Sequence, residues 1–166
     1  NLVNRTVAMT HKYFGGVVQY GEAREPLDDE INAACADAVS TVSRCFNTYH
    51  LSDADDAIFT LFRRANKYID ETMPWVLAKN DATLPRLGTV LYNLLETIRI
   101  GAILLEPFMP STSKAILDEI STDVRSLDST EKFGGLVVGT IVGEAKPLFA
   151  RIDETKFSTE IYKNNI

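Results

Sequence analysis

The chain has 166 residues, with 17 Lys and Arg against 23 Asp and Glu, so its formal charge is −6 with both His neutral. A composition of 45% hydrophobic and 24% charged residues excludes a disordered chain and predicts one globular domain with a single core. The acidic balance by itself disfavours a partner held mainly by phosphate charge.

Apolar residues at helical spacing predict five helices joined by short connections. Gly15-Gly16 stops the first helix, because glycine readily takes the left-handed conformation found at helix ends. Pro74 stops the third, because proline lacks an amide donor. The helices span, in order, Leu2 to Phe14, Pro26 to about Tyr49, about Ser52 to before Pro74, about Thr83 to Leu105, and about Ser111 to Ile120.

Residues 134–153 are too rich in glycine for a sixth helix. We expect an extended tail that packs Leu148, Phe149 and Ile152 against the helices. The predicted class is therefore an all-α, antiparallel five-helix bundle with an extended C-terminal tail packed on it. The domain should cover residues 1–153, with residues 154–166 as a C-terminal extension or the start of a linker.

The ends and the cysteines indicate where the chain comes from. It begins without an initiator Met or an apolar leader, so we expect a fragment of a longer polypeptide. Cys35 and Cys45 lie in a helical pattern without a metal-binding spacing, which predicts reduced, core-facing side chains of a cytoplasmic protein. No stretch approaches the roughly 20 apolar residues of a membrane span, so no membrane partner is expected.

Patterns typical of catalysis are missing. Neither His11 nor His50 follows a Glu at the spacing of a carboxylate-bridged metal site. The glycines between Gly139 and Lys146 are wrongly spaced for a phosphate loop. The residues therefore predict a helical domain that binds, with no catalytic or metal-ligating residue.

One segment concentrates residue types that read nucleobases. Asn66 and Asp70 lie four apart on one helical face, and the only Trp, Trp75, follows Pro74 just beyond the predicted helix end. Single-stranded bases stack on aromatic rings, and amides, carboxylates and guanidinium groups bind their edges. The alternative is that Trp75 fills the core and that the neighbouring cations form a solvated face. These cations are Arg63, Arg64 and Lys67.

Four blocks of sequence together resemble the anticodon-binding domain of methionyl-tRNA synthetases. They are Asn1–Arg5, Ala65–Lys79, Leu104–Pro110 and Pro147–Asp153, and they occur in the order of that family. The Glu-Pro-Phe-Met-Pro element is shared with related class I synthetases. The Asn-x-x-x-Arg opening, the Pro-Trp pair and the Pro-Leu-Phe-x-Arg-Ile ending are more specific.

The resemblance implies a role for six residues in recognising a CAU anticodon. Asn1 and Arg5 match the positions that contact anticodon bases in the family, and Trp75 matches the aromatic residue that stacks on one. Pro74 would hold that ring, and Asn66 with Asp70 would shape the pocket. Asn and Arg suit this task because each offers paired hydrogen-bonding groups that a wrong base leaves unsatisfied.

The resemblance also implies a cytoplasmic parent protein that attaches methionine to tRNA with ATP. Its catalytic domain would lie upstream and would hold the ATP. Whether zinc is also bound there is left open by the resemblance. This chain lacks the family's catalytic motifs, so we expect it to be inactive alone and to need no cofactor. Its expected partners are methionine-specific tRNA and the upstream domain, and not DNA.

The sequence leaves two alternatives open. One is the equivalent domain of a synthetase for leucine, isoleucine, valine or cysteine, and the other is a helical protein-interaction module that does not bind RNA. The distribution of charge favours RNA more than the net charge does. Between Asn1 and Tyr20 the cations Arg5 and Lys12 occur without an acidic residue.

Overall fold

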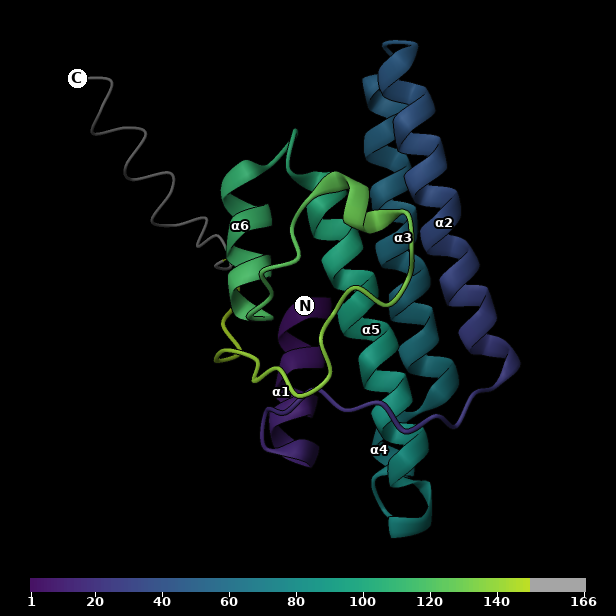
Figure 1. Cartoon of the computed structure of the whole chain (residues 1–166), viewed down its shortest axis with the longest axis vertical. Helices are drawn as coiled ribbons and strands as arrows, with labels where there is room; N and C mark the ends of the chain where they lie inside the picture. The colour runs from purple at the N-terminus through teal and green to yellow at the C-terminus, as the bar shows by residue number, and fades with distance from the viewer. Residues whose placement is uncertain (150–166) are drawn as a thin grey trace, which may run out of the picture.

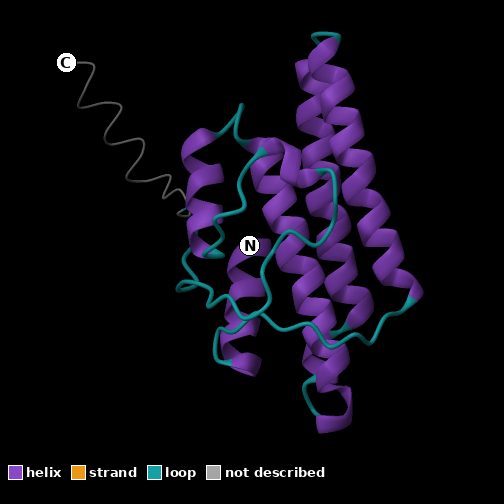
Figure 2. Cartoon of the chain, in the orientation of Figure 1, coloured by secondary structure: helices purple, strands orange, loops and turns teal. Residues whose placement is uncertain are grey.

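The computed structural model describes residues 1–149, which form a bundle around one central helix (Figure 1). This helix, α5, lies between the α2–α3 pair on one side and α6 on the other, while α1 packs on α5 and also contacts α3. The all-α class and the five main helices predicted from the sequence are confirmed, and the described residues contain helices and loops without a strand (Figure 2). The elements are α1 (Leu2–Phe14), α2 (Pro26–Asn47), α3 (Leu51–Thr72), α4 (Pro74–Leu77), η1 (Asp81–Thr83), α5 (Leu84–Leu105), α6 (Pro110–Glu119) and η2 (Leu127–Thr130).

α5 is buried along nearly its whole length because other elements pack against it on all sides. Every residue from Arg86 to Leu105 is buried, so the helix lacks the polar face of an ordinary surface helix. In the described part of the chain, Asp81–Leu105 alone is long and apolar enough to cross a membrane by length and composition. The expectation that no stretch approaches this limit is therefore wrong. The apolar window is entirely buried inside the bundle, which accounts for its composition.

α2 begins with a proline and contributes both cysteines to the core. Pro26 suits the first turn, where an amide donor has no partner within the helix, and Asp28 Oδ2 accepts a hydrogen bond from the Glu25 N–H at 2.8 Å. Cys35 and Cys45 are buried and free, as predicted. Burial raises the pKa of the Cys35 thiol to about 12, so this thiol stays protonated and unreactive.

After α6 the chain returns across α5 as a strap, residues 121–149, which contains η2 but is otherwise irregular (Figure 2). Leu136 and Val142 are buried in the core and Leu148 packs partly against it. Phe149, which was expected to pack, is 65% exposed, so this part of the prediction is wrong. The strap enters the core earlier, through Leu136 and Val142, and has reached the surface by Phe149. Ile152 and the boundary predicted after residue 153 lie outside the described residues.

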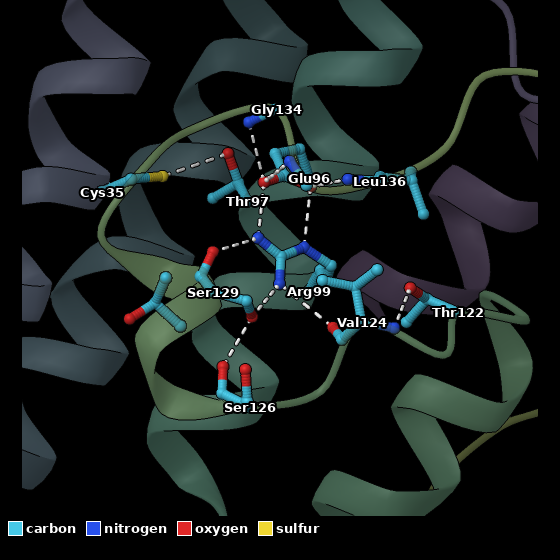
Figure 3. A network of polar contacts seen from close by, with 12 residues as sticks. Cys35, Glu96, Thr97, Arg99, Thr122, Val124, Ser126, Ser129, Gly134 and Leu136 are labelled. Carbon is cyan, nitrogen blue, oxygen red and sulfur yellow. Dashed lines mark hydrogen bonds and ion pairs between the residues drawn. The ribbon is translucent and has the colours of Figure 1, made fainter.

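A buried ion pair on α5 holds the strap in place (Figure 3). Glu96 accepts hydrogen bonds from Arg99 Nε and Nη2 at 2.9 and 2.7 Å. The backbone N–H groups of Gly134, Gly135 and Leu136 each donate to the same carboxylate at 2.9 Å. Both charged side chains are completely buried, and burial of a charge is tolerated only when it is paired and hydrogen-bonded. The strap is therefore an integral part of the fold.

Arg99 completes the network from the opposite side. Its guanidinium donates to the carbonyl oxygens of Val124 and Ser129 at 3.1 and 3.0 Å, and to Ser129 Oγ at 2.8 Å. The start of the strap is thus tied to the same α5 side chain that neutralises Glu96. The apolar stripe predicted for this helix does not include Glu96 or Arg99, so their burial was not predicted.

Candidate nucleic-acid interface

The predicted binding segment lies where α3 ends and the one-turn helix α4 begins. The α3 backbone ends with a hydrogen bond from the Met73 N–H to the Ile69 oxygen at 3.0 Å, and Thr72 Oγ1 donates to the Tyr68 oxygen at 2.6 Å. Met73 then takes a left-handed conformation, with φ 45° and ψ 64°. Such a conformation costs a non-glycine residue about 1–3 kcal/mol, so the surrounding structure must hold this break. Pro74 starts α4 immediately afterwards.

Trp75 is displayed on the outside of this junction. Its side chain is 42% exposed, and its neighbours Met73 and Val76 are 45% and 44% exposed, whereas Pro74 is buried. The alternative in which Trp75 fills the core is therefore wrong. Trp75 therefore offers an accessible aromatic ring on which an unpaired base can stack.

A second set of hydrogen bonds fastens α4 to the start of α5. Thr83 Oγ1 donates to the carbonyl oxygens of Leu77 and Asn80, at 2.5 and 2.8 Å. The Asn80 side-chain oxygen accepts from the Ala82 N–H at 3.0 Å. The turn that carries Trp75 is therefore held at both ends, by the α3 terminus before it and by η1 after it.

Asn66 and Asp70 lie on α3, in the two turns before the break. Asn66 is partly buried and its amide donates to the Phe62 oxygen of its own helix at 3.0 Å, while Asp70 is exposed. Among residues 1–149 Asp70 forms no ion pair. The carboxylate can therefore accept a hydrogen bond from a ligand, and the Asn66 oxygen can do the same.

Asn1 and Arg5 come from the first turn of α1. Asn1 is the exposed residue that precedes the helix, and its carbonyl oxygen accepts from the Arg5 N–H at 2.9 Å, so the two residues lie one helical turn apart. Arg5 is partly exposed and forms no ion pair within the described residues, and the same holds for Lys12 two turns later. α1 packs on α5 and also contacts α3, so Asn1 and Arg5 come from a different helix than Asn66, Asp70 and Trp75.

The cations of α3 are used differently from the way the sequence suggested. Arg64 forms ion pairs with Glu71 at 2.9 Å and with Glu30 of α2 at 3.0 Å, and Lys67 pairs with Glu71 at 3.3 Å. Arg63 donates to a threonine on its own helix. Arg64 and Lys67 are therefore neutralised within the protein, and the solvated face of cations considered above is wrong for Arg64.

A buried polar network fixes the C-terminal half of α3 to α2 and α5. The Tyr68 hydroxyl donates to Asp28 and accepts from the Asn93 amide at 3.1 Å. Arg86 donates to both Asp28 oxygens, at 2.7 and 2.9 Å. Burial alone would raise the pKa of Asp28, but the hydrogen bonds from Arg86 and Tyr68 more than offset this and lower it. Burial and the bond to Asp28 raise the pKa of Tyr68, which therefore remains a donor.

This network was not predicted from the sequence. Neither Arg86 nor Asn93 was predicted to have a role. Their spacing along α5, seven residues, does place them on one face, but the partners come from α2 and α3 and only the fold brings them together. In the described part of the chain, no group of three or more His, Cys, Asp or Glu side chains could hold a metal ion.

Residues 17–163 match the family profile described as the anticodon binding domain of methionyl tRNA ligase. The chain belongs to this family. The sister-synthetase and interaction-module alternatives are thereby set aside as family assignments.

Similar proteins are named methionine–tRNA ligase or methionyl-tRNA synthetase. The methionine–tRNA ligases of Clostridium perfringens and Clostridium tetani are 44% and 45% identical over 153 residues, which is 92% of this chain and 24% of each relative. The apo methionyl-tRNA synthetase of Mycobacterium tuberculosis has a similar structure, with a TM-score of 0.85 and 29% identity over 92% of this chain and 31% of that one. The chain thus spans about a quarter of the length of the curated relatives it matches.

Proposed function

We propose that this domain binds the anticodon loop of methionine-specific tRNA and selects the CAU anticodon. The observation that carries the proposal is the exposed Trp75, displayed on a braced one-turn helix in a chain of the anticodon-binding family. Stacking of an unpaired base on an exposed aromatic ring contributes about 1–3 kcal/mol. The ring itself distinguishes bases poorly, because every base has a flat face.

We assign selection of the correct bases to polar side chains of α1 and α3. Asn1 and Arg5 are placed on one helical turn with their side chains available, and Arg5 has no ion-pair partner among residues 1–149. Each offers two hydrogen-bonding groups in a fixed geometry, and a good bidentate pair discriminates against a wrong base by about 1–3 kcal/mol. Asn66 and Asp70 shape the pocket from α3, and Pro74 fixes the ring.

The whole protein would be an ATP-dependent methionine–tRNA ligase of the cytoplasm. In this proposal an upstream domain binds ATP and attaches the amino acid, and the domain described here supplies the recognition of tRNA without a cofactor of its own. A Mycobacterium tuberculosis relative with a TM-score of 0.83 is described in complex with methionyl-adenylate, the intermediate of such a reaction. The proposal includes neither DNA nor a membrane as partner.

Because Trp75 is the only tryptophan, its fluorescence tests the proposal directly. An anticodon stem-loop with CAU should change the emission at low micromolar to millimolar concentration, and variants with one substituted anticodon base should bind about fivefold or more weaker. Binding should fall only shallowly with salt, since few cations of the interface are unpaired. Equal affinity for CAU and substituted loops, or a steep loss of affinity with salt, would contradict the proposal.

A further inference from the structure

Two acidic residues lie in the last turn of α3, at the C-terminal end of the helix. Asp70 and Glu71 lie in this turn, which contains no basic residue. The C-terminal end of a helix carries partial negative charge, so adjacent carboxylates destabilise it. Such an arrangement persists only where something else compensates.

Two cations from earlier turns compensate for Glu71. Arg64 Nη1 lies 2.9 Å from one Glu71 oxygen and Lys67 Nζ lies 3.3 Å from the other. The Arg64 side chain is 18% exposed and that of Glu71 is 26% exposed, so this pair is more shielded from water than an ordinary surface ion pair. The ion pairs of Glu71 therefore offset its unfavourable position at the helix end, and they join the last turn of α3 to the two turns before it.

Arg64 extends the link to a neighbouring helix. Its second amino group lies 3.0 Å from Glu30 in the first turns of α2. A lysine at this position could not bridge two carboxylates in the same way, because only the planar guanidinium presents separate donors in a fixed fork. The cluster Glu30–Arg64–Glu71 thus connects the end of α3 to α2, only two residues before the left-handed Met73 and four before Trp75.

We propose that the Glu30–Arg64–Glu71 cluster is a positioning device for the RNA-stacking residue: it fixes the last turn of α3 and so sets the direction in which the Met73–Trp75 turn presents its ring. Glu71 and Arg64 are positioning residues and need not touch the RNA. The inference rests on the proposed function, because it assigns to these residues a part in anticodon binding.

The direction in which one substitution changes RNA affinity distinguishes a positioning role from an effect of charge alone. Glu71→Gln removes a negative charge close to the proposed RNA surface, and charge alone predicts tighter RNA binding. Loss of the ion pairs predicts weaker binding, because the ring of Trp75 is then held less firmly before the base arrives. The expected result is an affinity for the CAU stem-loop about three- to tenfold lower at low salt.

A matched control exists on α6. Asp118 also lies at a helix C-terminal end and also binds two cations, Lys114 four residues earlier and Arg125 seven residues later. This helix lies across α5 from α3 (Figure 1). Asp118→Asn removes the same charge and a similar cluster, so it reports the general effect of such a loss on stability.

The experiment uses the unaltered chain, Glu71→Gln, Arg64→Met, the double variant and Asp118→Asn. In the absence of RNA, acrylamide quenching and anisotropy of Trp75 report how firmly its ring is held; with the CAU stem-loop, the same fluorescence gives Kd. We expect stronger quenching, lower anisotropy and weaker binding for Glu71→Gln and for Arg64→Met. The double variant should be little worse than either single variant, because each substitution already breaks the shared link. Asp118→Asn should match the unaltered chain in all three.

The outcomes separate this inference from the proposed function. If the unaltered chain selects CAU and Glu71→Gln binds equally well or more tightly, the positioning role is overturned and the proposed function stands. Weaker binding with unchanged quenching and anisotropy would also overturn it, since the loss would not pass through Trp75. If the unaltered chain fails to distinguish CAU from substituted loops, the proposed function is overturned, and this inference with it.

Discussion

Replacement of Glu96 by Gln would test whether the buried ion pair is needed for the fold. The substitution changes neither size nor shape, but it removes the charge that neutralises Arg99. It also replaces one acceptor oxygen with an amide donor. That donor would then face either the guanidinium or the backbone N–H groups of Gly134, Gly135 and Leu136, which now donate to the carboxylate.

The magnitude follows from the burial of both partners. Glu96 and Arg99 are each 0% exposed, so the uncompensated guanidinium has no access to water. Breaking a buried pair in this way costs about 3–5 kcal/mol. A domain of this size has about 5–15 kcal/mol of total stability. Its unfolding temperature should therefore fall by roughly 6–20 °C, at about 2–4 °C per kcal/mol.

Urea unfolding followed by circular dichroism and by Trp75 fluorescence would measure the effect. Glu144→Gln is the control, because the Glu144 side chain is 84% exposed and its ion pair with Lys146 spans 3.4 Å. The control should change the free energy of unfolding by less than about 0.5 kcal/mol. If the destabilisation by Glu96→Gln exceeds that by Glu144→Gln by less than about 1 kcal/mol, the buried Arg99 does not need this partner, and the ion pair is not required for the fold.

Three further predictions address the binding site, the polar network and the packing. Trp75→Ala should raise Kd for the CAU stem-loop by roughly 5- to 150-fold, because the stacking ring is lost. Helix content should be unchanged, because Trp75 is 42% exposed and lies outside the core. Leu127→Ala, which removes another exposed apolar side chain, should change neither Kd nor helix content. Asp28→Asn should lower the free energy of unfolding by about 2–4 kcal/mol at pH 7. The pKa of Asp28 is held below its ordinary value of 3.8, so the stability that its charged form contributes is present above pH 3.8 and is lost as pH falls through the lowered pKa. Between about pH 4 and pH 2 the urea midpoint should therefore drop less for Asp28→Asn than for the unaltered chain. Equal drops would contradict the stabilising role of the Asp28 carboxylate. Gly101→Ala should lower the free energy of unfolding by about 1–3 kcal/mol, because its Cβ would lie 2.4 Å from a ring carbon of Phe62 on α3; an unchanged midpoint in urea would show that the ring moves aside freely.

The candidate site was only partly visible in the sequence. The spacing of Asn66 and Asp70 and the Pro74–Trp75 pair placed these residues at a helix end, and the exposure of Trp75 then excluded a role in the core. The ion pairs of Arg64 could not be foreseen, because one partner lies 34 residues earlier on another helix. Arg64 and Lys67 pair with carboxylates of the protein, so this segment offers RNA less positive charge than its sequence alone indicates.

The sequence by itself determined the helices and the all-α class, because apolar spacing, prolines and glycines act over a few residues. Its motifs also carried the resemblance to the family. Only the tertiary structure decided which polar residues are buried. Glu96 and Arg99 lie on the core helix and look out of place there until the strap supplies three N–H donors from about 40 residues later in the chain. Burial of a charge depends on partners that are distant in sequence, and only the packing of helices and strap brings those partners within hydrogen-bonding distance.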